Sequence, residues 1–227
     1  RFGGEFDEHS DLASGSGRKE GECSATLIGQ RLGLLDNLGM MPIFDYALRT
    51  DLKAGSQPFE FASLVTAMHS QHSDSPLVVI HWAKMALQAK YQQGLRSPQP
   101  ISEEKTIGRR KAIVSLWLAD HKEINASDLG AERIRKYADT KGVEHPFGLA
   151  NLDLALEQLA EERQVAWTWW SQLALSAKYH EQRQFLAAQK EYDAKRKEEI
   201  IQCCDGRRYL MVTIESENEM MGRVARS

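Results

Sequence analysis

Residues that begin and end helices recur at short intervals along the chain, and they constrain its fold more than any other feature. Pro42 begins a segment that ends at Gly55, and Pro58 and Pro76 begin two further segments. Proline is favoured in the first turn of a helix and glycine just past its last turn. No apolar run reaches the roughly 20 residues that a membrane-spanning helix needs. We therefore expect a mainly α-helical, multi-helix bundle that does not insert into a membrane.

Apolar side chains repeat along these segments at the spacing of one helical face. The two clearest stripes, at i, i+3, i+4 and i+7, are Phe61, Leu64, Val65, Met68 and Leu152, Ala155, Leu156, Leu159. This spacing places the side chains of each stripe on one side of a helix. We expect residues 149–179 to form one long helix or two, and residues 178–202 to form a long, mostly solvated helix.

Between the two stripes, glycines and prolines in residues 94–108 indicate an internal linker. A helix is expected over residues 102–122, and another from an N-cap at Ser127 to about residue 141. Their expected buried positions are Ile113, Leu116, Trp117, Ile134, Tyr137 and Ala138. We divide the chain into a polar arm (1–23), a helical region (24–94), a linker (95–108), a second helical region (109–202), and a strand with a tail (203–227).

Both ends of the chain differ from this helical pattern. Residues 1–22 hold three basic and six acidic residues and five glycines, so we expect an extended arm that is ordered only against a partner or the body. Residues 208–214 are rich in aromatic and β-branched residues and predict one short C-terminal strand. A single strand cannot satisfy its own backbone hydrogen bonds, so we expect it to pair with another chain unless an earlier segment pairs with it. Tyr209, Met211 and Val212 are therefore candidate partner-binding residues.

Charge and cysteine content exclude several classes of protein. The net charge of −3 provides no overall basic field of the kind that non-specific nucleic-acid binders use. Cys23, Cys203 and Cys204 are a poor disulfide framework because neighbouring cysteines rarely form a relaxed bridge. The first residues show no signal-peptide pattern. We expect the protein in the cytoplasm or within a particle assembled inside a cell.

One internal similarity spans ten residues. Residues 82–91 (WAKMALQAKY) align with residues 170–179 (WSQLALSAKY) at an offset of 88. Two equivalent helices of a duplicated unit would produce this pattern. Chance would also produce it, because alanine, leucine and lysine are common in helices.

Motifs that carry chemistry are incomplete in this sequence. His69 and His72 share a helical face and His81 follows, but only Asp74 is near enough in sequence to add a ligand, so we expect no metal. The phosphate-binding loops and the nucleophile motifs of hydrolases do not occur, and the adjacent acid pairs suit solubility better than acid–base catalysis. We therefore expect a protein that is not an enzyme and has no cofactor.

Trp167, Trp169 and Trp170 form the densest aromatic group. Positions i and i+2 of a helix point about 200° apart, so the three rings cannot all face one core. One interpretation is a thick interior on both sides of the helix. The other is a helix between its own core and a partner, which makes the three tryptophans candidate partner-binding residues.

A DNA-binding alternative comes from residues 106–167. The segments 112–120, 124–129 and 152–165 have the order and spacing of a helix-turn-helix module. The last segment resembles the helix that precedes the wing in winged-helix domains. Residues 105–141 contain nine lysines and arginines against five acids, and Arg133, Arg135 and Lys136 would contact phosphates. Against this, Gly130 lies near the start of the recognition segment, and helix-like sequence continues where a wing should be.

The function favoured by the sequence is a non-enzymatic structural or adaptor subunit. It would contact other protein chains of a larger assembly, such as a phage virion or a bacterial secretion-type complex, and a homo-oligomer is one form this could take. Four features lead to this prediction: the polar arm, the tryptophan-rich helix, the charged helix and the C-terminal strand. Nucleic acid is the less favoured partner.

Overall fold

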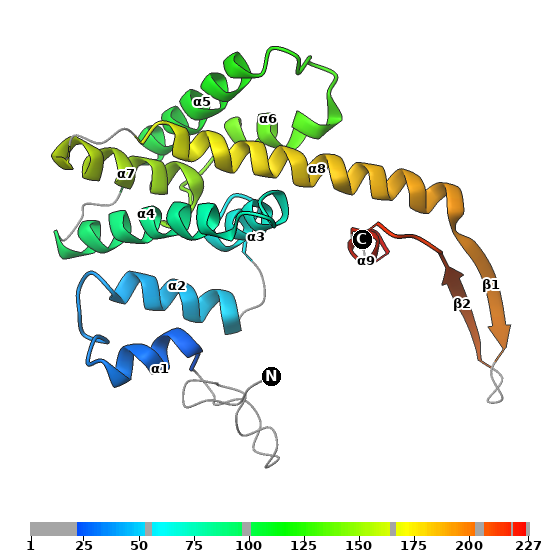
Figure 1. The fold of residues 1–227 in the computed structure, drawn as a ribbon, viewed down its shortest axis with the longest axis horizontal. Helices are drawn as coiled ribbons and strands as arrows, with labels where there is room; N and C mark the ends of the chain where they lie inside the picture. The colour runs from blue at the N-terminus through cyan, green and yellow to red at the C-terminus, as the bar shows by residue number, and fades with distance from the viewer. Residues whose placement is uncertain are drawn as a thin grey trace.

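The computed structural model describes residues 22–52, 56–96, 101–163, 167–202, 207–218 and 220–225 (Figure 1). All but the last two residues of the predicted arm lie outside these ranges, as do Cys203 and Cys204. Cys23 is buried at the N-cap of the first helix. Among the described residues, no helix combines the length and apolar content needed to cross a membrane.

The described chain is mainly helical, as the sequence predicts. The first four helices are α1 (Ser24–Arg31), α2 (Met41–Leu52), α3 (Phe61–Gln71) and α4 (Pro76–Leu95). The next four are α5 (Glu103–Asp120), α6 (Glu132–Ala138), α7 (Leu149–Arg163) and α8 (Trp169–Lys195), with a 3₁₀ turn η2 (Leu129–Ala131) before α6. The chain continues through β1 (Lys197–Gln202), β2 (Arg208–Thr213) and α9 (Met221–Val224).

Several predicted helix boundaries are confirmed, and one cap is not. Pro76 is the first residue of α4, and the Ser102 hydroxyl caps α5 by accepting a hydrogen bond from the Lys105 N–H at 3.2 Å. The cap predicted at Ser127 belongs to Asp128, whose carboxylate accepts hydrogen bonds from two backbone N–H groups of η2, at 2.8 and 3.3 Å. The Ser127 hydroxyl donates to Asn125 instead.

Two further expectations from the sequence are wrong. Leu116 was expected in the core but is 46% exposed, since the buried face of α5 is formed by Ile113, Val114 and Trp117. The charged helix expected to reach residue 202 ends at Lys195, and residues 197–202 form β1. β1 pairs antiparallel with β2, so the C-terminal strand has a partner within its own chain.

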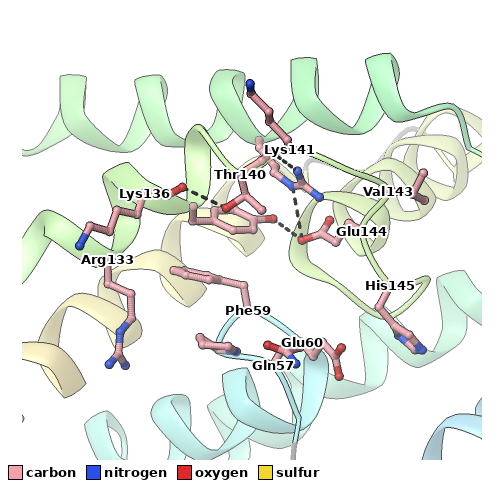
Figure 2. A pocket seen from close by; sticks show the side chains of 13 residues that line it. Gln57, Phe59, Glu60, Arg133, Lys136, Thr140, Lys141, Val143, Glu144 and His145 are labelled. Carbon is pink, nitrogen blue, oxygen red and sulfur yellow. Dashed lines mark hydrogen bonds and ion pairs between the residues drawn. The ribbon is translucent and has the colours of Figure 1, made fainter.

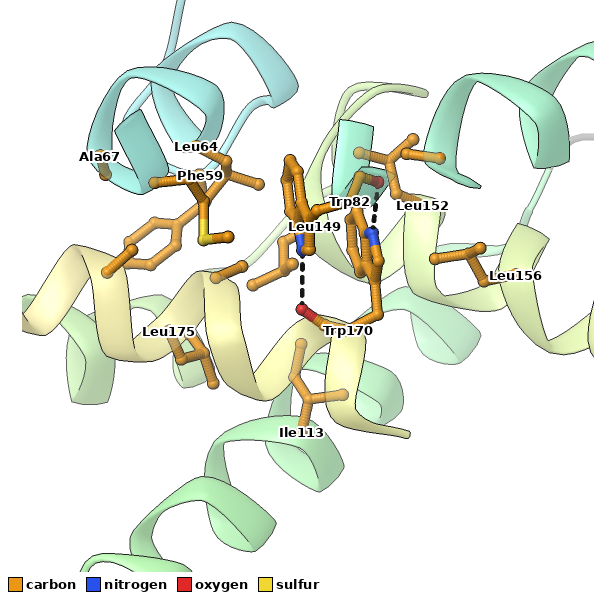
Figure 3. Packing of buried hydrophobic residues seen from close by; sticks show 14 of the residues in the cluster. Phe59, Leu64, Ala67, Trp82, Ile113, Leu149, Leu152, Leu156, Trp170 and Leu175 are labelled. Carbon is orange, nitrogen blue, oxygen red and sulfur yellow. Dashed lines mark hydrogen bonds between the residues drawn. The ribbon is translucent and has the colours of Figure 1, made fainter. Parts of the chain in front are cut away.

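Helices from both ends of the sequence share one hydrophobic core, in which α3 packs against α8 and α4 against α7 (Figures 1 and 3). At its centre the rings of Trp82 and Trp170 stack with centroids 4.3 Å apart and planes within 2°. The indole N–H of each donates to the backbone carbonyl of the other, at 2.9 Å in both directions (Figure 3). Both side chains are fully buried.

This exchange of contacts is the signature of a two-fold axis, where residue i contacts j and j contacts i. It continues beyond the tryptophans: the Phe61 N–H donates to the Phe147 carbonyl and the Leu149 N–H to the Phe59 carbonyl, both at 2.9 Å. The two bonds exchange equivalent residues, because Phe59 corresponds to Phe147 and Phe61 to Leu149 at the offset of 88 residues found in the sequence. The internal similarity therefore coincides with an approximate two-fold relation between a first half (α1–α4) and a second half (α5–α8).

Candidate functional site

A cavity of about 330 Å³ lies where the second half meets the start of α3 (Figure 2). Residues 57–60 line one side, and α6 with the loop that follows it, through His145, lines the other. We call this cavity the cationic pocket because Arg110, Arg133, Lys136 and Lys141 line it against only two carboxylates, Glu60 and Glu144. This local excess of positive charge occurs in a protein whose net charge is −3.

Two stacked aromatic rings form the floor of the cationic pocket. The centroids of Phe59 and Tyr137 lie 4.0 Å apart. The Tyr137 hydroxyl donates a hydrogen bond to Glu144 at 2.7 Å and accepts one from the Ala150 N–H at 3.0 Å. Burial raises the pKa of Glu144 above its ordinary value and, together with the neighbouring Glu144 charge, raises the pKa of Tyr137. The polar atoms of the floor are thus engaged in hydrogen bonds within the fold.

Arg110 holds the loop that forms the wall of the pocket. Its guanidinium donates to the carbonyl of Thr140 at 2.5 Å and to that of Gly142 at 3.2 Å, and its Nε lies 3.9 Å from a Glu144 oxygen (Figure 2). Gly148 makes room for this arrangement, because a Cβ there would lie 2.2 Å from the Glu144 Cγ. Arg110 is therefore a structural cation, with both Nη groups committed to the loop.

The rim of the cationic pocket is different. Arg133 is half-buried and Lys141 is exposed, and neither has an ion pair or hydrogen bond with any described residue. Lys136 is 76% exposed and forms an i, i+4 pair with Glu132 at 2.5 Å. Figure 2 shows Arg133 and Lys136 on α6 and Lys141 in the loop that follows it, with the charged ends of the three side chains pointing in different directions. The rim thus offers two uncommitted cations and a third that is only loosely held.

The two-fold relation gives this pocket a counterpart in the first half, a cavity of about 230 Å³ that we call the Asp45 pocket. Tyr46 stacks on Phe147 with centroids 4.3 Å apart, and its hydroxyl accepts from the Ala62 N–H at 2.9 Å. At an offset of 91 residues, Pro42, Asp45 and Tyr46 correspond to Arg133, Lys136 and Tyr137. The Asp45 pocket therefore shares the aromatic floor, but the arginine in its lining, Arg49, is paired with Glu60.

The three predicted partner-binding tryptophans point in different directions, as the spacing requires. Trp170 is in the core, whereas Trp169 is 38% exposed and stacks on His81 with centroids 6.3 Å apart. Trp167 is half-buried beneath the guanidinium of Arg109, at 4.8 Å. A partner could reach only Trp167 and Trp169, and such contact stays a prediction.

The predicted residues Tyr209, Met211 and Val212 lie on the β1–β2 hairpin, which extends beyond the end of α8, away from the helical core (Figure 1). Every residue of both strands is exposed. The exposed apolar side chains are Ile200 (66%), Ile201 (38%), Tyr209 (49%), Leu210 (62%), Met211 (40%) and Val212 (38%). The strand register alternates these residues between both faces of the hairpin.

The residues proposed for DNA contact have separate roles. The Arg135 guanidinium donates to the carbonyls of Ala126 and Asp128 at 3.0 Å and to that of Asn125, which holds the loop before α6. Arg133 and Lys136 reach the pocket rim instead. Residues 149–156 of α7 are all buried, so they offer no face to a DNA groove, and α8 follows where a wing would be.

The candidate metal ligands do not converge. His69 and His81 are exposed and His72 is half-buried. Within the described ranges, no group of three or more histidine, cysteine and acidic side chains is placed to hold a metal ion.

The cationic pocket was not recognised from the sequence, because its residues come from three separate stretches of the chain: residues 57–60, Arg110 and residues 133–145. A signal existed: residues 43–47 (IFDYA) and 134–138 (IRKYA) share isoleucine, tyrosine and alanine at equal spacing, and Pro58-Phe59 is repeated as Pro146-Phe147. Together with the ten-residue similarity, these repeats would have predicted two related pockets.

Comparison with protein families, curated proteins and solved structures finds no match to this chain.

Proposed function

We propose that this protein is a non-enzymatic structural subunit that joins other protein chains through its β1–β2 hairpin. The observation that carries the proposal is the exposure of six large apolar side chains on a two-stranded ribbon. An isolated two-stranded hairpin is marginally stable in water, and large apolar side chains exposed together are characteristic of an interaction site. Contact with another chain would cover this surface.

The charge distribution favours the outer edge of β2 as the contact. β1 carries Lys197, Glu198 and Glu199, whereas β2 carries one charge, Arg208, at its first position. Charged residues on an edge strand oppose pairing with a further strand. β2 therefore has the edge that can accept a strand by β-augmentation, with main-chain hydrogen bonds providing affinity.

The partner that we propose is β2 of a second copy. Two antiparallel β2 strands related by a two-fold axis would place apolar residues opposite one another and keep the two Arg208 side chains at opposite ends. The resulting four-stranded sheet would exceed the three strands that a stable sheet generally needs. Closed two-fold dimers are also the commonest symmetric assembly.

The test is the oligomeric state of the full chain, measured by sedimentation over a concentration series. Leu210 and Ile200 are cross-strand partners with nearly equal exposure, 62% and 66%, which makes them a matched pair. Leu210→Glu on the contact edge should raise the dimer dissociation constant by about 10-fold or more, the equivalent of roughly 1.4 kcal/mol. Ile200→Glu, one strand further away, should change it much less.

Two results would overturn this assignment. A wild-type chain that stays monomeric at every concentration has no self-association to explain. Equal disruption by Leu210→Glu and Ile200→Glu would mean that a face of the hairpin, and not the edge of β2, makes the contact. Circular dichroism provides the folding control, since both side chains are exposed.

The wider assembly expected from the sequence, a phage particle or a secretion-type complex, stays a prediction. DNA binding stays the alternative, now limited to Arg133 and Lys136 of the three residues first considered, since Arg135 holds a loop.

A further inference from the structure

We propose that the cationic pocket binds a small molecule through a phosphate or carboxylate group held by Arg133 and Lys141. The pocket shares no residue with the β1–β2 hairpin, so this site is independent of the proposed assembly contact. Its volume of about 330 Å³ lies within the range of small-molecule sites.

The first argument is the availability of the two cations. Most arginines around the pocket are committed: Arg110 and Arg135 donate to backbone carbonyls, and Arg49 is paired with Glu60. Arg133 and Lys141 have no partner among the described residues, although Arg133 is half-buried. A partly desolvated guanidinium gains from an oxyanion, with which it forms charge-assisted and often bidentate hydrogen bonds.

The second argument is that the two carboxylates in the lining do not cancel this positive charge. Glu60 is 4% exposed and its oxygen lies 2.5 Å from the Arg49 guanidinium, on the side of the Asp45 pocket. Glu144 accepts hydrogen bonds from Tyr137 and from the N–H groups of Ala150 and Asn151, at 2.7, 3.0 and 3.2 Å. Both acids are used within the fold, so the rim cations remain available.

The third argument comes from the two-fold relation. Both pockets keep the tyrosine, the phenylalanine on which it stacks, and the preceding proline, which shows that these residues serve the fold. The residues that differ are at the rim, where Pro42 and Asp45 replace Arg133 and Lys136. The arginine of the Asp45 pocket, Arg49, is paired with Glu60, so only the cationic pocket has rim cations without a partner among the described residues, and a ligand bound there would account for them.

A small ligand is favoured over a nucleic acid by shape. The cations line one concave site, and the neighbouring α7 presents no exposed face over residues 149–156. A duplex would need several phosphate contacts spread along its backbone. The ligand that we propose is therefore a compact anion. The test below distinguishes it from a DNA duplex.

The test is isothermal titration of the full chain at low ionic strength with inorganic phosphate and, separately, with citrate. Arg133→Gln/Lys141→Gln removes the two rim cations. The matched control, Lys84→Gln/Lys111→Gln, removes the same charge from exposed lysines outside the pocket. The wild-type chain should bind at one site, and the rim variant should bind at least about 10-fold more weakly, since a hydrogen bond to a charged group contributes about 1.5–3 kcal/mol. The control should bind like the wild-type chain.

The relative strength of the two titrations distinguishes a phosphate site from a carboxylate site. The proposal is overturned if neither anion binds, or if the rim variant and the control lose affinity equally, which would indicate a general charge effect. It is also overturned if a DNA duplex binds with salt-dependent affinity and displaces the bound anion. Thermal unfolding checks the variants, and no loss of stability is expected because Arg133 and Lys141 have no partner among the described residues.

Discussion

Tyr46 in the first half and Tyr137 in the second have equivalent aromatic and backbone partners. The carboxylate near each tyrosine, however, comes from a different position in the sequence. Beside Tyr46 stands Glu60, paired with Arg49; at the equivalent of Glu60 the second half has Gly148, and Glu144 from the preceding loop takes the place beside Tyr137. Each tyrosine thus has a carboxylate nearby, but the residue that supplies it and the charges around it differ between the halves. The comparison indicates that the stacked rings belong to the fold and that the rims are free to diverge.

A second difference lies deeper in the core. Lys90 and Lys178 occupy equivalent positions on α4 and α8, and both are nearly buried, at 6% and 2% exposure. Lys178 is paired with the Glu181 carboxylate, whereas Lys90 faces the neutral amide of Gln93 and lies 5.3 Å above the Phe147 ring. Without a nearby acid, burial lowers the pKa of Lys90 to about 8.

The largest expected effect tests the two-fold core itself. Trp82→Ala and Trp170→Ala should each lower the free energy of unfolding by about 3–5 kcal/mol, because each leaves a large cavity. The two losses should be nearly equal, since the stack and both hydrogen bonds are reciprocal. Urea denaturation measures them, with Leu116→Ala on the exposed face of α5 as the control. If the two losses of unfolding free energy differ severalfold, the two tryptophans are not equivalent and the two-fold relation is contradicted.

A smaller effect separates the two halves. Lys178→Met should cost about 3 kcal/mol at neutral pH, because it leaves the buried Glu181 carboxylate without its lysine. Lys90→Met should cost no more than about 1 kcal/mol, the value of one hydrogen bond, because Gln93 is neutral. Each variant controls for the other in urea denaturation. Equal losses would show that the acid at position 181 does not distinguish the halves.

The smallest effect is a pH dependence of the first half. The ordinary pKa of lysine is 10.5 and that of folded Lys90 is about 8, so between these values the unfolded chain binds more protons. The free energy of unfolding contributed by Lys90 should therefore rise with pH, by about 1–2 kcal/mol from pH 8 to 9.5. Lys90→Met should lack this rise. The window ends near pH 10, where Tyr46 and Tyr137, whose pKa values are raised, act in the opposite direction.

Local sequence signals predicted most of the helices. Pro42, Pro58 and Pro76 lie within a few residues of helix starts, and the stripe from Leu152 to Leu159 is buried in α7. The strand over residues 208–213 was also predicted. Its partner strand was not, because Lys197, Glu198 and Glu199 continue the charged composition of α8 and only pairing with β2 makes them extended.

The candidate site was less accessible to sequence reasoning. Arg133 and Lys136 were singled out as cations, but Lys141 and Glu144, a few residues further on, were not, and the pocket also needs Phe59 from far earlier in the sequence. The offset of 88 residues was visible over ten positions. What could not be read from it was the reciprocal hydrogen bonding of Trp82 and Trp170, which depends on how the halves meet in space.

That reciprocal pairing has a consequence for synthesis on the ribosome. The apolar face of α3 and α4, with Leu64, Met68 and Trp82, is complete long before its partners on α7 and α8 have been translated. Contacts between residues 88 positions apart form late, and they make folding slower. An apolar surface that is exposed until its partner helices are made is prone to aggregate. The nascent first half is therefore the stage at which we expect this chain to be most prone to aggregate.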